Sequence, residues 1–319
     1  MNLSLVIPVY NEEENLPLLF DSVYELFETI GGEWEAILVD DGSRDKSFEV
    51  LKEHAEKDPE HIKVICFRRN FGQTAAIAAG IDHAQGEIVA LMDADLQNDP
   101  ADIPMLLDKL NEGYDVVSGW RKNRQDNFIT RTLPSRLANG LISRVTGLHL
   151  HDYGCTLKVY RREVLSGFRL YGEMHRFIPV YAYAVGAKIT EVPVRHHPRK
   201  YGKTKYGLER TAKVILDLFT VKFLISYMNK PIYLFGGAGL ILMAISGLTL
   251  LYLAVRRIFF LVSVLASPLF NTSVMFFIMG FLSILMGLIA EMVIRTYHEA
   301  QDRKTYTIRE RINFPKGEA

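Results

Sequence analysis

Ile88-Val-Ala-Leu-Met-Asp-Ala-Asp-Leu-Gln-Asn-Asp-Pro100 is the stretch from which the fold can be worked out. Its first five residues are apolar, as is typical of a strand buried on both faces of a sheet. Asp93, Asp95, Gln97 and Asp99 follow directly. Carboxylates just past a strand end lie at the carboxyl edge of an open α/β sheet, where ligands bind. A water-exposed acidic loop is the alternative, but this spacing favours a hard-oxygen site for Mg²⁺ or Mn²⁺.

The rest of the amino-terminal part alternates strands with helices. Apolar runs predict strands over 5–10, 34–39, 62–67, 88–92 and 116–119, with later strands within 152–160 and 189–194. Helical spacing predicts helices over about 14–27, 44–57, 73–84 and 102–112. Such alternation implies an α/β fold with a mostly parallel sheet and right-handed crossovers.

The carboxyl-terminal part changes to apolar composition. Residues 232–255 and 272–290 carry no charge, and each run is long enough to cross a bilayer at about 20 residues per span. Two buried core helices are the less favoured alternative. The segment 208–228 reads as a basic amphipathic helix lying in the membrane interface. The link 256–271 either prolongs the first span or re-enters the membrane, and the sequence leaves both open.

Charge and cysteine content exclude several classes. The 319 residues have a formal net charge of +0 and two cysteines, so neither nucleic-acid binding nor a disulfide framework is expected. The start of the chain lacks a basic region, so no signal peptide is expected. Positive charge lies outside the hairpin more than in its turn, which places the large domain and the tail in the cytoplasm. The expected division is 1–206 catalytic, 207–230 interfacial, 231–296 two-span hairpin and 297–319 tail.

Two segments are rich in basic residues. Residues 121–144 form either a solvated helical face or a surface for an anionic substrate or lipid headgroup. Residues 195–205 contain His196 and His197, but no further histidine or cysteine has ligand spacing, so a metal site there is disfavoured. The chain also has neither a P-loop nor a Gly-x-Gly-x-x-Gly after its first strand, which argues against a P-loop enzyme or a dinucleotide dehydrogenase.

Four motifs resemble a known family. Val6-Ile-Pro-Val-Tyr-Asn-Glu12, Val39-Asp-Asp-Gly-Ser43, Arg69-Asn-Phe-Gly72 and Asp93-Ala-Asp-Leu-Gln97 are similar to those of family 2 glycosyltransferases with the A-type nucleotide-sugar fold. Within that family the whole chain, hairpin included, resembles the polyisoprenyl-phosphate glycosyltransferases. These include dolichol-phosphate mannose synthase, the bactoprenol glucosyltransferases and, closest in Asp152-Tyr-Gly-Cys155, Tyr160-Arg-Arg162 and Gly202-Lys-Thr-Lys205, the undecaprenyl-phosphate aminoarabinose transferases.

The resemblance implies roles for the matching positions. Asp93, Asp95 and Gln97 would hold Mg²⁺ or Mn²⁺ and the diphosphate, and Arg121 and Arg136 would face the phosphate of the lipid. The nucleotide sugar would be bound by Pro8, Tyr10, Glu12, Val39, Asp40, Asp41, Asp93, Ala94, Arg199 and Lys205. The resemblance further implies a homo-oligomer, a tetramer, at the inner membrane, and favours UDP over GDP.

The expected reaction is an inverting transfer of a sugar to a polyisoprenyl phosphate such as undecaprenyl phosphate. The acceptor oxygen is already anionic near neutral pH, since the second pKa of a phosphate monoester is about 6, so a general base is barely needed. Stabilising the departing nucleotide diphosphate is the larger task. Some relatives carry an Asp near the position of Cys155, so either Asp152 serves as a base or none is required; the second is favoured.

The sequence also bears on other functions. A GDP-mannose-using enzyme of the dolichol-phosphate mannose synthase type and a non-catalytic membrane anchor are the alternatives. A processive polysaccharide synthase is disfavoured because Gln-x-x-Arg-Trp is missing. A flippase is disfavoured because two spans offer little path for a headgroup. The identity of the sugar does not follow from the sequence.

Overall fold

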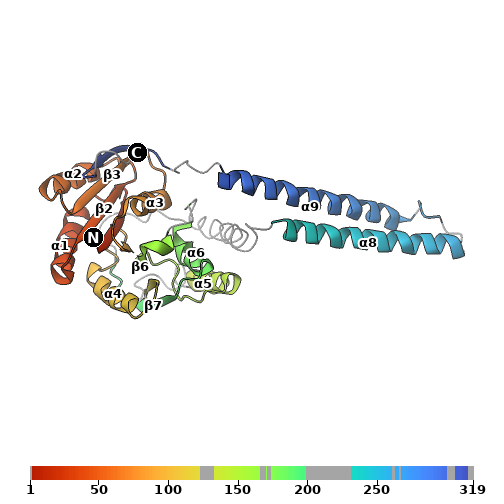
Figure 1. Cartoon of the computed structure of the whole chain (residues 1–319), viewed down its shortest axis with the longest axis horizontal. Coiled ribbons are helices and arrows are strands. Elements are labelled where there is room, and N and C mark those ends of the chain that lie inside the picture. The colour runs from red at the N-terminus through yellow and green to blue at the C-terminus, as the bar shows by residue number, and fades with distance from the viewer. Residues whose placement is uncertain are drawn as a thin grey trace. The chain divides into compact units, whose positions relative to one another are not determined.

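The structure is a computed structural model that describes residues 2–122, 133–165, 170, 174–198, 231–260, 263–265, 267–299 and 306–314. The chain forms two compact units, Met1–Val221 together with Lys304–Ala319, and Lys222–Arg303. The first unit is built on one sheet and the second on two long helices (Figure 1). The predictions for Arg199, Lys205 and the interfacial helix at 207–230 concern residues outside the described part of the chain.

The sheet unit confirms the predicted alternation of strands and helices. Its strands are joined in the order β7-β5-β6-β4-β1-β2-β3-β8. The elements are β1 Leu3–Val9, α1 Leu16–Ile30, β2 Trp34–Asp40, α2 Ser47–Lys57, β3 Ile62–Phe67, α3 Gln73–His83, β4 Ile88–Leu91, η1 Pro100–Asp102, α4 Ile103–Asn111, β5 Val116–Trp120, α5 Leu133–Thr146, β6 Lys158–Arg161, η3 Arg162–Leu165, η4 Met174–Phe177, α6 Ile178–Ala184, β7 Ile189–Pro193 and β8 Ile308–Ile312.

The sheet is mostly parallel, as the alternation predicts. β2 and β4 both pair with β1 in parallel, β3 pairs with β2 in parallel, and β7 pairs with β5 in parallel. β6 is antiparallel to both β4 and β5, because the chain returns between them after α5. The carboxyl ends of β1, β2 and β4 therefore share one edge, and β6 begins beside the end of β4, opposite Leu91.

Helices cover both faces of the sheet. Leu5, Ile7 and Val9 of β1 face one core, together with the apolar sides of α1, α2 and α4. α3 packs on the other face at very close range: a Cβ on Gly80 would lie 2.2 Å from Cγ1 of Val6. Gly80 is thus needed because only a glycine lets the helix backbone approach β1 this closely. This close approach brings the start of α3 to the sheet edge where β4 ends.

The last strand of the sheet comes from beyond the apolar helices. β8 pairs antiparallel with β3, opposing Val64 with Ile312. The amide of Asn313 donates to the backbone oxygens of Ala55 and Ile62, at 2.7 and 2.8 Å. The sequence analysis treated this region only as a tail, because Ile308-Arg-Glu-Arg-Ile312 is short and charged. Such charges are common on edge strands, where they discourage pairing with other chains. The chain therefore leaves the sheet unit before α8 and returns to it after α9.

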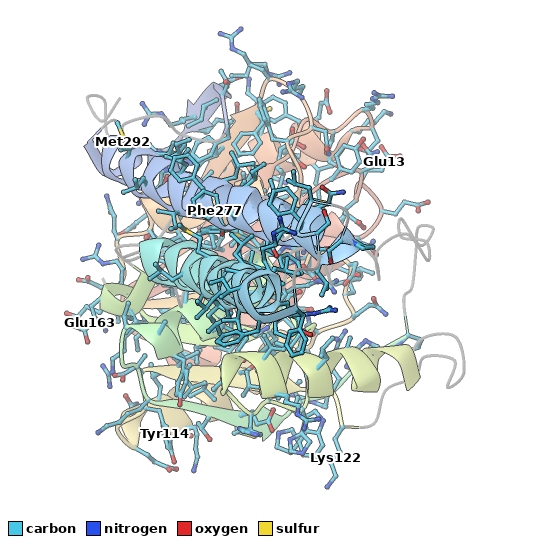
Figure 2. The ribbon with its side chains drawn as sticks, turned by 90° about the vertical axis from the view of Figure 1, so that its right-hand side faces the viewer. Glu13, Tyr114, Lys122, Glu163, Phe277 and Met292 are labelled. Carbon is cyan, nitrogen blue, oxygen red and sulfur yellow. The ribbon has the colours of Figure 1, made fainter. Side chains whose placement is uncertain are left out.

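The helical unit is an antiparallel hairpin of α8, Pro231–Phe260, and α9, Pro268–Glu299. Within it, Leu234–Phe260 and Pro268–Ala290 are long and apolar enough to cross a membrane. In each of them, only 17% of the residues in an apolar stretch of 18 are buried. Core helices of a soluble domain would be mostly buried. Phe277 and Met292, both on α9, are among the exposed apolar side chains (Figure 2). α8 runs on to Phe260, so the first part of the 256–271 link prolongs the helix.

Small residues hold the two helices together. A Cβ on Gly239 would lie 2.5 Å from the backbone oxygen of Gly280, and the reverse distance is 2.6 Å. The hydroxyl of Ser246 donates to the backbone oxygen of Ser273 at 2.7 Å, and both residues are fully buried. Such packing suits a lipid environment, where close van der Waals contact and interhelical hydrogen bonds drive helix association.

Candidate functional site

The ends of β1 and β2 are joined by hydrogen bonds between their loops. The backbone N–H of Asn11 donates to Oγ of Ser43 at 3.0 Å, and that of Glu12 donates to Oγ of Ser47 at 2.8 Å. Pro8 lies opposite Val39 in the parallel pairing of the two strands. The predicted nucleotide residues of these strands are therefore brought together at one sheet edge.

Asp41 is the most strongly constrained acid at that edge. It is buried, and its two carboxylate oxygens accept the backbone N–H groups of Phe71 and Gly72, at 2.6 and 2.9 Å. Burial raises the pKa of Asp41 to about 6, although these two hydrogen bonds lower it, and Asp40 adds to the rise. A Cβ on Gly42 would lie 2.5 Å from the backbone of Arg69, so Gly42 permits the close approach of this loop. The motifs around Asp41 and Arg69 thus form one rigid corner.

Asp40 is turned into the protein instead. Its carboxylate accepts the backbone N–H of Ser43 at 3.1 Å and the thiol of Cys66 at 3.1 Å. Burial raises the pKa of Cys66 to about 12, with Asp40 adding to the effect, so this thiol is protonated and unreactive near neutral pH. Asp40 is 1% exposed, and these two contacts hold the turn that follows β2.

Asp93 stands at the end of β4 with both carboxylate oxygens held in place. Nε2 of Gln73 donates to Oδ1 at 2.7 Å, and the hydroxyl of Thr156 donates to Oδ2 at 2.6 Å. Gln73 is the first residue of α3, and Thr156 precedes β6. Neither partner was predicted from the sequence, although Gln73 directly follows the Arg69-Asn-Phe-Gly72 motif and Thr156 directly follows Asp152-Tyr-Gly-Cys155.

The remaining residues of the acidic motif continue the same edge. Ala94 and Asp95 are buried, and the backbone N–H of Gln97 donates to Oδ1 of Asp95 at 3.2 Å. Leu96 between them has a φ of 59°, which is uncommon for a residue with a side chain and turns the chain sharply. Two carboxylates and one amide oxygen within five residues suit a hard divalent cation that keeps positions open for phosphate and water. Among the described residues, no group of three or more His, Cys, Asp or Glu side chains is arranged to hold a metal ion.

The segment after Gln97 is clamped by residues that follow β7. The backbone N–H of His197 donates to the backbone oxygen of Gln97 at 2.9 Å. Arg195 pairs with two acids, through Nη1 to Asp99 at 3.0 Å and through Nε to Asp102 at 2.8 Å. Asp99 therefore serves an ion pair here, in addition to capping η1. The sequence analysis grouped Arg195 only with a basic cluster and missed this role.

Arg121, at the end of β5, is engaged by Asp152. Two of its guanidinium nitrogens contact the two carboxylate oxygens, at 2.7 and 3.0 Å. Burial opposes the charge of the guanidinium, but the Asp152 carboxylate outweighs it and keeps the pKa of Arg121 above its usual value. Arg136 lies on α5, and its side chain is outside the part of the chain that the structure describes. The structure thus brings Arg121 to the same edge as Asp93 and leaves the predicted partnership of Arg121 with Arg136 untested.

A lysine that the sequence analysis passed over lies beneath this edge. Lys158 of β6 is 2% exposed, and its amine donates to the backbone oxygen of Tyr153 at 3.3 Å and also to that of Cys155. Burial lowers the pKa of Lys158, while the neighbouring Cys155 and Asp152 oppose this effect. Lys158 thus fixes the turn that carries Asp152 and Thr156.

Comparisons with known proteins agree with this geometry. The sequence profile of glycosyl transferase family 2 matches residues 4–168. The dodecaprenyl-phosphate galacturonate synthase of Rhizobium johnstonii is 41% identical over 97% of this chain and 93% of its own. The undecaprenyl-phosphate 4-deoxy-4-formamido-L-arabinose transferase of Pectobacterium atrosepticum is 38% identical over 98% of this chain and 94% of its own.

Solved structures share the fold of the sheet unit. A crystal structure of a mycobacterial protein superposes with a TM-score of 0.52 and 18% identity, covering 70% of this chain and 74% of that one. The glucosyl-3-phosphoglycerate synthase of Mycobacterium tuberculosis, in complex with Mn²⁺ and uridine-diphosphate-glucose, superposes with a TM-score of 0.50 and 17% identity, covering 70% and 78%. At this identity the likeness concerns the fold alone.

Proposed function

We propose, from the premise that this chain belongs to glycosyl transferase family 2, that it transfers a sugar from a nucleotide sugar to a polyprenyl phosphate at a membrane. The observation that carries the proposal is the shared sheet edge, where Asp41, Asp93 and Arg121 follow the ends of β2, β4 and β5. Relatives that match nearly the full length of the chain are named as polyprenyl-phosphate sugar transferases. The apolar hairpin supplies a means of reaching a lipid acceptor.

The donor would lie along this edge. Pro8, Tyr10, Glu12, Val39 and Asp41 would line the nucleotide, with Asp40 holding the turn behind it. Asp93, Asp95 and Gln97 would hold Mg²⁺ or Mn²⁺, which when bound would stabilise the charge of the departing diphosphate. The glucosyl-3-phosphoglycerate synthase of the same fold was solved in complex with Mn²⁺ and uridine-diphosphate-glucose.

The transfer step needs little proton chemistry from the protein. An oxygen of the lipid phosphate forms a bond to the anomeric carbon of the sugar while the bond from that carbon to the nucleotide diphosphate breaks. The electron pair of the broken bond leaves with the diphosphate, and in-line attack inverts the configuration. Asp152 already binds Arg121 through both oxygens, which leaves it poorly suited to act as a base. We assign Asp152 the task of orienting Arg121 toward the phosphate of the acceptor.

The topology supports one orientation in the membrane. Because β8 belongs to the same sheet as β1, the residues before α8 and after α9 must lie on the same side of any bilayer that the hairpin crosses. Arg256 and Arg257 lie in the last part of α8, before the turn. Arg295 lies near the end of α9, and Arg303, Lys304, Arg309 and Arg311 follow that helix in the sequence. By the positive-inside rule, the sheet unit would face the cytoplasm at the inner membrane.

The test is transfer by the full-length protein in detergent. Undecaprenyl phosphate would be offered with labelled UDP- and GDP-sugars, with Mn²⁺ or Mg²⁺ and with a chelator. We expect one donor class to give a lipid-linked product only with metal. Asp95→Asn should abolish this product, while the exposed Asp108→Asn on α4 serves as a matched control that keeps it. Full activity of Asp95→Asn would overturn the metal assignment, and no lipid product from any donor would overturn the proposed reaction.

The two relatives differ in the sugar that their names contain. The Rhizobium johnstonii protein is named for an acidic sugar, galacturonate. The Pectobacterium atrosepticum protein is named for an uncharged sugar, 4-deoxy-4-formamido-L-arabinose. The two are similarly close to this chain, at 41% and 38% identity. A feature of the chain itself is therefore needed to choose between the two classes of donor.

A further inference from the structure

The strand that returns after the apolar helices lies beside the loop that holds Asp41. β8, dark blue in Figure 1, pairs with β3 along the edge of the sheet. One more hydrogen bond continues this contact past the end of β3, since the backbone N–H of Arg68 donates to the backbone oxygen of Thr307 at 3.1 Å. Arg68 directly precedes the Arg69-Asn-Phe-Gly72 motif. The residues just before β8 therefore contact the start of that loop.

Tyr306, just before β8, anchors the returning chain at two points. It is 7% exposed, and its ring stacks on that of Phe67, with 5.1 Å between the ring centres and 17° between the ring planes. Its hydroxyl donates to Oδ2 of Asp82 near the end of α3, at 2.8 Å. Phe67 is the last residue of β3, and α3 is the helix whose first residue, Gln73, donates to Asp93. Tyr306 thus binds the two elements that flank the loop 68–72.

The ring of Phe67 carries this contact on toward the candidate site. Phe67 meets Phe71 edge-on, with 5.6 Å between the ring centres and 86° between the ring planes. The backbone N–H of Phe71 in turn donates to the carboxylate of Asp41 at 2.6 Å. Stacked and edge-on aromatic pairs are stabilising beyond the area that they bury. An aromatic row of Tyr306, Phe67 and Phe71 therefore connects the returning chain to the nucleotide end of the candidate site.

The loop 68–72 is a segment for which such support matters. Arg68, Arg69 and Asn70 are exposed, and Phe71 is half-buried. Segments with few buried contacts open locally at a small cost in free energy. The loop is anchored through the ring of Phe71 and through the N–H groups that Asp41 accepts. A displacement of the rings in the aromatic row would thus be passed on to this carboxylate.

We propose that Tyr306 is a positioning residue for the nucleotide end of the donor site. By holding Phe67, and through it Phe71, it fixes the loop whose N–H groups bind Asp41. The strand that returns from the apolar helices thereby sets the affinity for the nucleotide. The inference rests on the proposed function, because it assigns a further residue to that same site. It concerns binding of the nucleotide and not the lipid acceptor or the transfer step.

The test measures nucleotide binding by the full-length protein in detergent. UDP and GDP are titrated calorimetrically in the presence of Mn²⁺, so that no transfer is required. Tyr306→Leu removes the stacked ring and should weaken binding of the preferred nucleotide by about three- to tenfold, as for the loss of one aromatic pair. Tyr306→Phe keeps the ring and should stay close to wild type. If Tyr306→Leu does not fold, Tyr306→Met takes its place.

The outcomes separate this inference from the proposed function. Equal nucleotide affinity in Tyr306→Leu and wild type would overturn the inference, whether or not sugar transfer is observed. Weaker nucleotide binding in Tyr306→Leu would support it even if no lipid product were found. Failure of the wild-type protein to bind either nucleotide would overturn both.

A double variant tests whether the aromatic row carries the effect. Phe71→Leu interrupts the row from the side of the loop and should itself weaken nucleotide binding. Because Tyr306→Leu interrupts the same row, the double variant should bind the nucleotide hardly more weakly than Phe71→Leu alone. Effects that simply add would show that Tyr306 acts by another route and would overturn the proposal.

Asn313→Gly is the matched control at the other end of β8. It removes the amide that donates to the backbone oxygens of Ala55 and Ile62. Asn313 has a φ of 64°, which glycine adopts readily, so the backbone conformation is kept. We expect a lower melting temperature with unchanged nucleotide affinity. A loss of affinity as large as that of Tyr306→Leu would assign the effect to general loosening of β8 and overturn the proposal.

Hydrogen exchange locates the effect without any ligand. In Tyr306→Leu the backbone N–H groups of residues 68–72 should exchange faster than in wild type, because Phe71 and Gly72 are then held less firmly on Asp41. In Asn313→Gly the faster exchange should instead fall near Ile62. Unchanged exchange across residues 68–72 in Tyr306→Leu would show that the loop does not depend on Tyr306 and would overturn the proposal.

Discussion

Arg121 and Asp152 form a two-pronged ion pair at the candidate site, with Nε of the arginine 2.7 Å from Oδ2 of the acid and Nη2 3.0 Å from Oδ1. Both side chains are largely buried, at 15% and 4% exposure. The backbone N–H of Gly154 also donates to Oδ1 of Asp152 at 3.0 Å. A Cβ on Gly154 would lie 3.1 Å from Nη2 of Arg121, so the turn leaves room for the guanidinium. The pair joins the end of β5 to the turn before β6.

Stability and use of the lipid phosphate should respond differently when the pair between Arg121 and Asp152 is removed. Arg121→Ala leaves the buried Asp152 carboxylate without its cation and should destabilise the protein by about 3–5 kcal/mol. The double variant Arg121→Ala with Asp152→Asn should recover much of that stability, yet still fail to use the lipid phosphate well. Thermal unfolding and KM for the lipid, measured on the two single variants and the double variant, separate the two effects.

Asp152→Asn alone tests whether a base is needed. Asparagine keeps the shape of the side chain and one acceptor oxygen for Arg121, but it cannot take a proton. We expect a raised KM for the lipid with kcat lowered by less than about tenfold, since general bases typically contribute about 100- to 10,000-fold. A kcat loss of that larger size, with KM unchanged, would show that Asp152 is the base.

The parallel core of the sheet was predictable because β1 to β4 are short runs of mostly apolar residues. The predicted ranges 34–39 and 62–67 are observed as 34–40 and 62–67. β8 was not predictable in the same way, since its partner β3 lies more than 200 residues earlier and its own side chains are charged. β8 is a strand because it pairs with β3 in the folded protein. Tyr306, just before β8, stacks on Phe67 of β3 with 5.1 Å between the ring centres.

The residues of the candidate site also differ in whether the sequence predicts them. Asp41 and Asp93 were predicted from strand-end motifs, because the carboxyl ends of parallel strands meet at one edge of a sheet. Arg121 was predicted from the family resemblance. The residues that orient them come from elsewhere in the chain. Gln73 reaches Asp93 from the start of α3, and Arg195 reaches Asp102 from beyond β7. Periodicity and spacing carry no signal for such long-range contacts between single side chains.

Asp41 should make stability depend on pH. Burial raises its pKa from 3.8 to about 6 in the folded protein. A raised pKa means that the folded state holds the proton more tightly, so stability is greatest below the unfolded pKa and is lost as pH rises toward about 6. The shift corresponds to about 3 kcal/mol as an upper bound. At pH 4.5, Asp41→Asn should melt at a lower temperature than wild type, because it loses one backbone hydrogen bond. At pH 7.5, this difference in melting temperature should become smaller or change sign, because the wild-type protein then carries a buried charge.

The comparison between the two proteins isolates Asp41 from other titrating groups. Both proteins are melted in the same detergent at pH 4.5 and 7.5. The change in melting temperature between the two pH values is then compared between the variant and wild type. A gap in melting temperature that stays constant between pH 4.5 and 7.5 would show that the pKa of Asp41 is not raised.

The hairpin offers a matched pair of glycine substitutions. Gly239→Ala places a methyl group 2.5 Å from the backbone oxygen of Gly280, so the helices must separate. A Cβ on Gly247 of the same helix has nothing within 4 Å. We expect Gly239→Ala to lower the melting temperature in detergent, while Gly247→Ala leaves it unchanged or raises it, because alanine favours helix by about 1 kcal/mol over glycine. Equal effects of the two substitutions would mean that the helices do not pack through Gly239.

Gln73 and Thr156 donate hydrogen bonds to Asp93, so they should affect the affinity of the site for its metal without being metal ligands. Thr156→Val keeps the shape of the side chain and removes the hydroxyl that donates to Oδ2 at 2.6 Å. A metal ligand that loses such an outer hydrogen bond typically loses about 10- to 100-fold in affinity for its metal. We therefore expect the Mn²⁺ concentration for half-maximal transfer to rise by about tenfold, with much of kcat recovered at saturating metal. Thr156→Ser restores the hydroxyl and should restore the wild-type metal requirement, which a loss of packing alone would not do. A rise in metal requirement of the same size in Thr156→Ser would assign the effect to packing, whereas an unchanged requirement in Thr156→Val would leave Gln73 as the residue that orients Asp93.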